Sequence, residues 1–447
     1  MSESLAFDPG TGLPRLRHAI ADFARWRQEE NDPEKCHGLV VLDIKPSAAL
    51  LRLSTEAGEL LRQEVSWRLA DVLRPNDRLY VLGQWEWLVL LFSLPSPASV
   101  SLAMLRLNHT LQPPLQELGS EGFLLQPVCG GAVCPDHGGD PQHLVQSARI
   151  AALHASEQEE WSALYRPDME QRSSERADLS RRLQSALLGG DLQLFLQPQI
   201  DLADCRCRSA EALLRWKHPN GQWVDPVVAV ELLEQAGMRP DFNRWLFQRA
   251  ALYLSQLREK KQEIRISINL TARDLLDPEV PDLLEQALAT WSLPPGSLTL
   301  EITETTAVRE SREVEDILRR LGAMQAQLSI DDFGTGYAGM AYLQHLPVQE
   351  IKVDKRFIRN LAQSTRDREI TASIIELAHK LGMHVVAEGV ESIEAKKCLE
   401  DMGCERIQGH LYSPALPMEA FLRWVSCGRQ FVPRSPADGD SPRGGAG

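Results

Sequence analysis

Short apolar segments alternate with longer helix-prone segments from about residue 190 onward. Eight of the short segments have the length and apolar content of strands, in the order LQLFLQPQI, AEALLRW, RISINL, LTLEIT, QLSIDD, EIKVD, HVVAEGV and RIQGHLY. Helical patterns such as VEDILRRLGAMQA, with Gly near their ends, separate most of them. This alternation predicts the βα units of a TIM-like (β/α)8 barrel. Only DLADCRCR joins the first two segments, which is too short for a crossover helix, so we expect one antiparallel strand.

Length and composition divide the rest of the chain. At 447 residues it exceeds one average domain, and a polar, helix-prone stretch that ends in Gly-Gly runs from about 157 to 190. We therefore expect a first domain over 1–156, a helical linker over 157–180 and the barrel over 181–428. Residues 429–447 are rich in Gly, Pro and Ser and have too few apolar side chains to fold, which predicts a disordered tail.

The composition is that of a globular protein, with 43% hydrophobic and 25% charged residues. The first ten residues lack the basic start and apolar core of a signal peptide, and no apolar run reaches the length of a membrane span, which favours a cytoplasmic protein. The eight cysteines form no four-ligand zinc pattern, so we expect reduced thiols. A net charge of −14 disfavours a long nucleic-acid partner, whereas a small anionic substrate is compatible with local cations.

Polar and ionisable residues follow nearly every predicted strand, at the end where barrels of this kind carry their chemistry. They are Glu211, Arg215, Asn269, Glu301, Glu304, Asp331, Asp332, Lys352, Asp354, Glu388 and Gln408. The adjacent Asp331 and Asp332 would raise each other's pKa unless a cation lay between them. Oxygen ligands without Cys or an obvious His favour Mg²⁺ or Mn²⁺. Two ions that share an aspartate would form the two-metal arrangement that cleaves phosphodiesters.

Each of these residues also has an ordinary explanation. Asp331 and Asp332 could simply end a strand before the turn sequence FGTG. Glu388 could cap the following helix, and Lys352 could be a solvated charge at a strand edge. It is the joint occurrence of all the positions that favours a metal site.

Seven ordered segments resemble the motifs of the EAL-domain family of cyclic di-GMP phosphodiesterases over roughly residues 180 to 428: EALLRW, NLTARDLL, EITET, DDFGTGYAGMAYL, KVDKRFI, AEGVES and QGHLYS. The resemblance implies hydrolysis of cyclic di-GMP to linear pGpG with two Mg²⁺ or Mn²⁺ ions, on a barrel whose first strand is antiparallel. It implies that one ion is held by Glu211, Asn269, Glu301 and Asp331. The other ion would be held by Asp331, Asp332 and Glu388.

The resemblance also implies catalytic roles for three residues beyond the ligands. Lys352 would orient the attacking water and offset developing negative charge, and Gln408 would contact that water or the nearby phosphate. Glu304 would brace the loop over residues 333–340, which borders the metal site and the homodimer interface in this family. We therefore expect a homodimer whose geometry reaches Asp331 through this loop.

Substrate contacts follow from the same resemblance. Arg215 would pair with a phosphate through its planar donors, and Gln197 and Asp354 are further candidates. The sequence departs from the family where DPVVAV carries Val-Ala-Val in place of a common Phe-Ile pair, and where His410 replaces an aromatic residue. These departures concern packing and substrate affinity, not metal binding.

Residues 1–156 resemble a GGDEF domain, the fold that makes cyclic di-GMP from GTP, through DPGTGLPRLRHAI, GLVVLDIKP and the closing segment that begins VCGGAVC. The sequence GQWEW at residues 83–87 replaces the family signature, and only Asp43 and Glu86 survive as metal-ligand positions. Gln84 and Trp85 stand where a second Gly and an acid are expected. We therefore expect a catalytically inactive regulatory domain, with GTP as a weakly bound candidate partner.

Two alternatives stay open. Arg74 and Asp77 match the RxxD inhibitory motif of GGDEF domains, although we favour a helix-end Arg and a turn Asp. The whole chain could instead be a non-catalytic receptor for cyclic di-GMP, or a hydrolase of another cyclic dinucleotide. Receptors of this kind usually lack one or more metal ligands, and all are present here.

Overall fold

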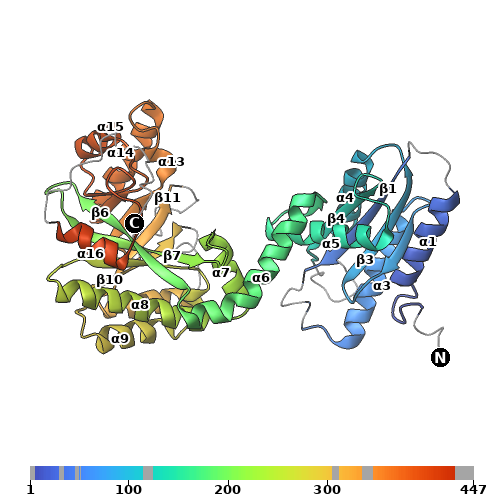
Figure 1. Ribbon diagram of the computed structural model, residues 1–447, viewed down its shortest axis with the longest axis horizontal. Helices are drawn as coiled ribbons and strands as arrows, with labels where there is room; N and C mark the ends of the chain where they lie inside the picture. The colour runs from blue at the N-terminus through green and yellow to red at the C-terminus, as the bar shows by residue number, and fades with distance from the viewer. Residues whose placement is uncertain are drawn as a thin grey trace, which may run out of the picture. The chain divides into compact units, whose positions relative to one another are not determined.

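The computed structural model describes residues 6–29, 35–45, 50, 52–113, 124–304, 312–334 and 346–427. The chain divides into two compact units, Met1–Asp178 and Leu179–Gly447 (Figure 1). The predicted tail over 429–447 lies outside the described residues, as do residues 335–340 of the predicted loop. No helix in the described ranges is both long and apolar enough to cross a membrane.

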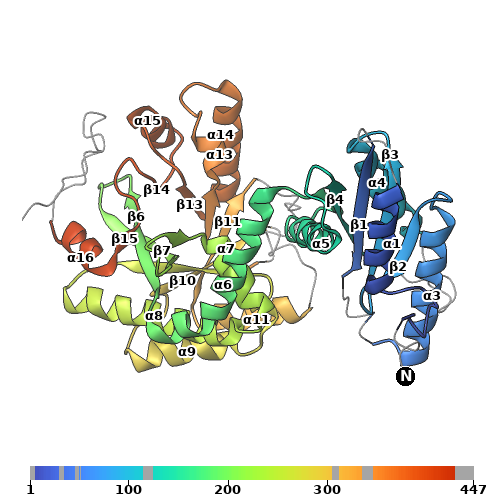
Figure 2. The ribbon, with the colours of Figure 1, turned by 45° about the vertical axis from the view of Figure 1, so that its right-hand side comes forward.

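The first unit contains a five-stranded sheet between two helical layers (Figure 2). The strands, in sheet order, are β2 (Arg78–Val81), β3 (Glu86–Leu94), β1 (Cys36–Ile44), β4 (Pro127–Cys134) and β5 (Ser162–Leu164). The helices are α1 (Leu16–Glu29), α3 (Thr55–Asp71), α4 (Ala98–Leu111) and α5 (Pro141–Glu157). Alternate side chains of β1 enter two separate cores. Leu39 and Val41 pack with α1 and α5, whereas Val40 and Leu42 pack with α3 and α4.

The second unit is built on a closed ring of eight strands, which confirms the predicted barrel. In ring order they are β6 (Leu192–Asp201), β14 (Arg406–Gln408), β13 (His384–Ala387), β12 (Glu350–Val353), β11 (Gln327–Phe333), β10 (Leu298–Thr303), β9 (Arg265–Leu270) and β7 (Cys207–Lys217). Two short strands, β8 (Trp223–Val224) and β15 (Leu416–Pro417), pair with β7 and β6.

Strand β6 runs antiparallel to both of its neighbours, as the short connection to β7 predicts. The remaining strands of the ring are parallel to one another. The register places Gln197 opposite Glu211, and Gln199 opposite both Ser209 and Gln408. Side chains from three strands therefore meet on one stretch of the barrel wall.

Helices surround the ring and close its core. They are α6 (Pro167–Gly189), α7 (Pro226–Gln235), α8 (Arg239–Glu259), η2 (Asp274–Leu276), α9 (Val280–Thr290), α11 (Arg312–Ala323), α13 (Lys355–Ile358), α14 (Thr365–Lys380), α15 (Ile393–Asp401) and α16 (Met418–Ser426). Side-chain caps fix the start of several, including Asp225 at α7, Ser364 at α14 and Ser392 at α15.

Two strands are shorter than their apolar sequence runs suggest. β13 ends at Ala387 and β14 at Gln408. Beyond them the backbone of Val390 donates to Gln408 O at 3.0 Å and accepts from Leu411 N at 3.0 Å. This close approach requires Gly409, because a Cβ there would lie 2.0 Å from Val390 O. The two chain segments that follow Glu388 and Gln408 are thus held against each other.

Candidate active site

Lys352 lies at the centre of an acidic cluster inside the barrel, and its side chain is 0% exposed. Its Nζ lies 2.6 Å from Glu388 Oε1, 2.8 Å from Glu301 Oε2, 3.1 Å from Asp331 Oδ1 and 3.3 Å from Glu211 Oε2. Burial alone would lower the pKa of Lys352, but the four carboxylates raise it well above its ordinary value. The residue is therefore a buried ammonium, and the explanation as a solvated edge charge is wrong.

The four carboxylates exceed what one ammonium can neutralise. Burial raises the pKa of Glu388 to about 7 and that of Glu301 well above its ordinary value, although Lys352 opposes both shifts. Burial would also raise the pKa of Glu211, but Lys352 and the amides of Gln408 and Asn269 outweigh it and keep the pKa low. The raised pKa values show that the excess negative charge is unfavourable without further cations, which would stabilise the ionised carboxylates.

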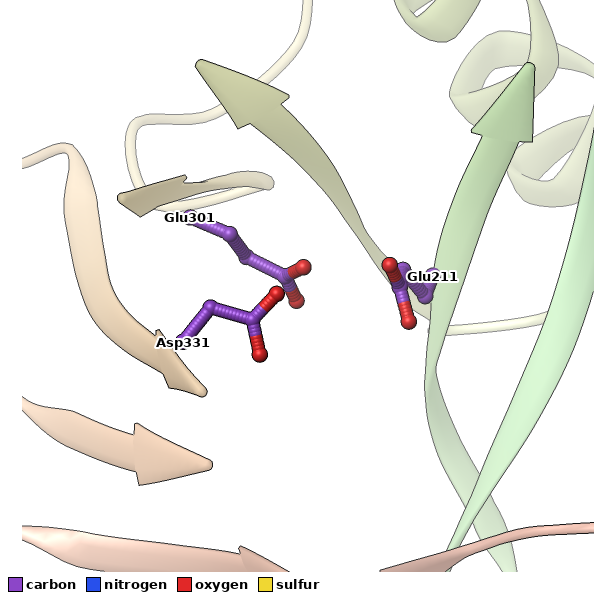
Figure 3. A group of neighbouring side chains, drawn as sticks. All are labelled: Glu211, Glu301 and Asp331. Atoms are coloured by element: carbon purple, nitrogen blue, oxygen red, sulfur yellow. The ribbon is translucent and has the colours of Figure 1, made fainter. Parts of the chain in front are cut away.

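Two groups of ligand atoms in this cluster are close enough to hold cations. One contains Glu211, Glu301 and Asp331, and the other contains Asp331, Asp332 and Glu388, with the ligand atoms of each group within 4.8 Å of one another. Asp331 belongs to both groups. Figure 3 shows the side chains of the first group extending from three different strands toward a common space. A shared Asp331 is what the family resemblance implies, and the two groups of ligand atoms are compatible with it.

The residues fit a hard divalent cation. All the grouped ligand atoms are carboxylate oxygens, which Mg²⁺ and Mn²⁺ prefer. Glu301 Oε1 is buried and has no hydrogen-bond partner among the described residues, so its lone pairs can face an ion. Asn269 lies beside the first group, where its Nδ2 donates to Glu211 Oε1 at 2.8 Å.

Asp332 and Asp354 lie next to the second group. Burial, with Asp331 and Asp354 nearby, raises the pKa of Asp332 to about 6. The backbone of Asp332 adopts φ 54°, at the point where the pairing of β11 with β12 shifts register between Ile330 and Phe333. Asp354 is buried and caps α13 by accepting from Arg356 N at 2.7 Å. Asp354 therefore both lies next to Asp332 and caps a helix.

Glu304 and Glu388 each make a contact that bears on the role expected of them. Glu304 accepts from Gly334 N at 2.9 Å, which ties the end of β10 to the residue that follows β11. Glu388 does not cap α15, because Ser392 Oγ accepts from Ala395 N at 3.1 Å and supplies the cap. The side chain of Glu388 instead turns to Lys352.

Arg215 borders a cavity of about 400 Å³ beside Asn269. Its guanidinium lies 5.9 Å from the ring centre of Phe195, and Nη1 donates to Leu214 O at 2.8 Å. The walls include the apolar side chains of Leu213 and Val230. Sequence reasoning missed this cavity, although Val230 belongs to the Val-Ala-Val segment that departs from the family pattern.

The amide of Gln408 lies at the other side of the cluster. Its Nε2 donates to Glu211 Oε2 at 2.6 Å and to Gln197 Oε1 at 3.1 Å. Gln199, which sequence reasoning missed, donates to Gln408 Oε1 at 2.9 Å. The alternation of Gln197 and Gln199 along β6 was the available signal, because residues two apart in a strand share a face.

The first unit carries a different charge arrangement at its surviving acids. Glu86 accepts from Arg149 Nε and Nη2, both at 2.6 Å. Asp43 pairs with Glu86 in register across β1 and β3, and burial and Glu86 raise its pKa. Gln84 and Trp85 line a cavity of about 940 Å³. An arginine therefore already neutralises one of the two acids.

Arg74 and Asp77 bind each other in the same unit. Arg74 donates from Nε to Asp77 Oδ2 at 2.9 Å and from Nη2 to Oδ1 at 2.8 Å. Asp77 also accepts from Phe92 N at 3.3 Å, and its side chain is buried. These contacts are those of the simpler explanation, in which the pair closes the turn after α3.

A family model described as the EAL domain matches residues 180–415. The chain is 32% identical over 377 residues to the cyclic di-GMP phosphodiesterase NbdA of Pseudomonas aeruginosa, which covers 83% of this chain and 48% of that protein. It is 32% identical over 371 residues to the bifunctional diguanylate cyclase/cyclic di-GMP phosphodiesterase MucR of the same organism, covering 83% and 54%. The chain thus spans about half the length of these curated relatives.

Solved structures resemble the second unit. The structure described as PaMucR phosphodiesterase in complex with c-di-GMP matches with a TM-score of 0.53 and 34% identity, covering 55% of this chain and 99% of that one. The FimX EAL domain of Pseudomonas aeruginosa bound to c-di-GMP matches with a TM-score of 0.50 and 29% identity, covering 54% and 98%. In both cases nearly the whole of the solved chain corresponds to about half of this one.

Proposed function

Because the chain belongs to the EAL domain family, we propose that its barrel hydrolyses cyclic di-GMP to linear pGpG. The observation that carries the proposal is the arrangement of carboxylates around Lys352, in which Asp331 is shared by two groups of ligand atoms. Relatives and a solved structure named as cyclic di-GMP phosphodiesterases support the substrate and the reaction. In this reaction, water adds across one phosphodiester bond and a 3′ hydroxyl leaves.

Two Mg²⁺ or Mn²⁺ ions fit the cluster. The first would be held by Glu211, Asn269, Glu301 and Asp331, and the second by Asp331, Asp332 and Glu388. When bound, the ions would supply Lewis-acid stabilisation of the negative charge that develops on the phosphate and would activate the attacking water. The unpartnered Glu301 Oε1 supports the first of these positions.

The side chains of the barrel provide binding and orientation around the reacting phosphate. Lys352 would keep positive charge next to the developing negative charge, because its pKa stays high despite burial. Gln408 would contact the water or the phosphate with the donor that it otherwise gives to Gln197, and Arg215 would pair with a phosphate oxygen. The apolar cavity beside Arg215 is suited to an aromatic base.

The first unit is proposed to be a degenerate GGDEF domain that does not make cyclic di-GMP. Gln84 and Trp85 occupy signature positions, and Glu86 is bound by Arg149 in place of a metal. GTP could bind weakly in the cavity beside Trp85, which Arg15 and Arg62 also line. A homodimer of the full chain is proposed on resemblance alone, and light scattering at micromolar concentration tests it.

The test of the main proposal is incubation of the purified full chain with cyclic di-GMP and Mg²⁺ or Mn²⁺, followed by chromatography of the nucleotides. We expect pGpG to appear with either metal and to disappear with EDTA. A parallel incubation with cyclic di-AMP tests the alternative substrate: hydrolysis of cyclic di-AMP but not of cyclic di-GMP would favour a hydrolase of another cyclic dinucleotide. If the protein bound cyclic di-GMP tightly but formed no pGpG, the proposed hydrolase function would be wrong and a non-catalytic receptor would be favoured.

A further inference from the structure

A continuous chain of hydrogen bonds crosses the barrel interior from Arg406 to Glu211. Arg406 Nη1 donates to Ser209 Oγ at 3.0 Å, and Ser209 Oγ donates to Gln199 Oε1 at 2.6 Å. Gln199 Nε2 donates to Gln408 Oε1 at 2.9 Å, and Gln408 Nε2 donates to Glu211 Oε2 at 2.6 Å. We call these five residues the hydrogen-bond chain.

Strand register explains why the members meet. Gln199 is the direct cross-strand neighbour of both Ser209 on β7 and Gln408 on β14. The neighbours of an antiparallel pair lie within reach of each other's side chains. The reversed direction of β6 therefore brings together side chains that are 197 residues apart in sequence, such as Gln408 and Glu211.

The residues at the two ends of the hydrogen-bond chain, Arg406 and Glu211, determine which partner donates in every bond between them. A guanidinium can only donate, so Ser209 Oγ accepts from Arg406 and uses its own hydrogen toward Gln199. Gln199 must then present its carbonyl oxygen to Ser209 and its NH₂ group to Gln408. Gln408 in turn presents its oxygen to Gln199 and its NH₂ group to Glu211, which as a carboxylate can only accept.

Arg406 is itself held in place at the far end. It forms an ion pair with Glu350, the first residue of β12, through Nη2, and both side chains are nearly buried. All five members of the hydrogen-bond chain are buried. Because buried amides without competing water keep the orientation that satisfies all partners, reversal of one would leave others unsatisfied.

We propose that Arg406, Ser209 and Gln199 are positioning residues that fix the amide of Gln408 with its NH₂ group toward the metal-ligand candidate Glu211. The expected effect on hydrolysis rests on the proposed function, whereas the orientation of the Gln408 amide does not. The oriented amide donates to Glu211 Oε2 at 2.6 Å and so holds the side chain of Glu211 within the first group of ligand atoms. Hydrogen bonds of this kind from outer residues orient metal ligands and tune metal affinity.

The test compares two substitutions at Gln199 that leave Glu211 and Gln408 intact. Gln199→Met preserves length and volume but can neither accept from Ser209 nor donate to Gln408. Gln199→Glu can still accept from Ser209, but as a carboxylate it cannot donate to Gln408 and would draw the NH₂ group of Gln408 away from Glu211. Gln286→Glu, on the exposed face of α9, adds the same charge elsewhere and is the matched control.

Mn²⁺ affinity is measured without substrate by EPR titration, and kcat and KM are measured separately. Both Gln199 variants should bind Mn²⁺ roughly 10- to 100-fold more weakly than wild type, with kcat reduced more than KM is changed. An added negative charge alone would strengthen cation binding, so weaker binding in Gln199→Glu identifies the loss of the donor. Gln286→Glu should match wild type.

Unchanged or tighter Mn²⁺ binding in Gln199→Glu would overturn the proposal, even if Gln199→Met were impaired, because packing alone would then explain the defect. If Gln199→Glu does not fold, wild-type Mn²⁺ affinity and kcat in Gln199→Met would overturn it. An inactive wild type whose Mn²⁺ binding still weakens in both variants would refute the proposed function and leave the positioning role standing.

Discussion

At the scale of single residues, the acidic cluster depends on Lys352. This ammonium contacts four carboxylates and is fully buried, so the described structure balances part of a large negative charge with one side chain. Removing one partner of a buried ion pair leaves the other charges uncompensated, which costs more than the pair itself contributes. The metal ligands and the lysine therefore share one electrostatic balance.

Lys352→Met should destabilise the metal-free protein by about 3–5 kcal/mol, because it leaves the carboxylates without their cation. Added Mn²⁺ should raise the unfolding temperature of this variant more than that of wild type. Thermal unfolding by circular dichroism, with EDTA and with Mn²⁺, measures both effects. Lys380→Met removes an exposed lysine paired with Glu376 and should leave the unfolding temperature unchanged. Equal metal-free stability of Lys352→Met and wild type would contradict the balance described above.

Asp331 and Asp332 offer a matched comparison between adjacent residues of one strand. Asp331→Asn should abolish hydrolysis and the binding of both ions, because Asp331 alone belongs to both groups of ligand atoms. Asp332→Asn should remove only the ion of the second group. Mn²⁺ stoichiometry from calorimetry checks the difference, with circular dichroism to verify the fold. Two bound ions in Asp331→Asn would refute a shared ligand.

At the scale of elements, the eight strands and the antiparallel hairpin could be predicted, because apolar runs and a short connection constrain local structure strongly. Asp331 and Lys352 lie near the carboxyl ends of β11 and β12, as predicted, whereas Glu211 lies in the middle of β7. The contacts that could not be predicted join distant residues. Arg149 and Glu86 are 63 residues apart and Arg406 and Glu350 are 56 apart, and nothing in the local pattern of either residue indicates its partner.

Gly409 joins two elements of the site, and its substitution tests that connection. A Cβ at this position would lie 2.0 Å from Val390 O and 2.4 Å from Val390 N, so Gly409→Ala must push apart the segments that carry Gln408 and Glu388. We expect a loss of about 1–3 kcal/mol in stability and reduced hydrolysis. Gly189→Ala, where an added Cβ would meet no atom of the described residues within 4 Å, should not destabilise the protein. Chemical denaturation of both variants provides the measurement, and equal stability would show that the segments can separate freely.

At the scale of the whole molecule, the two units differ in how their acids are neutralised. In the first, Arg149 binds Glu86 through two hydrogen bonds, whereas in the second the acids outnumber their lysine. From the sequence, the only sign that the first unit lacks a metal site is the segment GQWEW. Arg149, which neutralises Glu86, lies on α5 and belongs to no motif that would have indicated this contact.

The full chain should therefore make no cyclic di-GMP from GTP. The measurement uses Asp331→Asn, in which any product would not be hydrolysed, with GTP and Mg²⁺ and detection by chromatography. A GGDEF protein with an intact signature serves as the positive control for the assay. Detectable cyclic di-GMP would show that Gln84, Trp85 and Arg149 do not prevent catalysis.

Helix α6 determines where the molecule can be divided. Met169, near its start, packs in a core of the first unit, whereas Leu183 and Leu187 pack in the core of the second. The boundary at Asp178 falls within this helix, so a fragment that begins at Leu179 starts with a truncated helix. We expect a fragment of residues 167–427 to unfold at a higher temperature than one of residues 179–427, because short helices lose their first turns readily. A barrel prepared alone for crystallisation or inhibitor screening should therefore keep the entire helix.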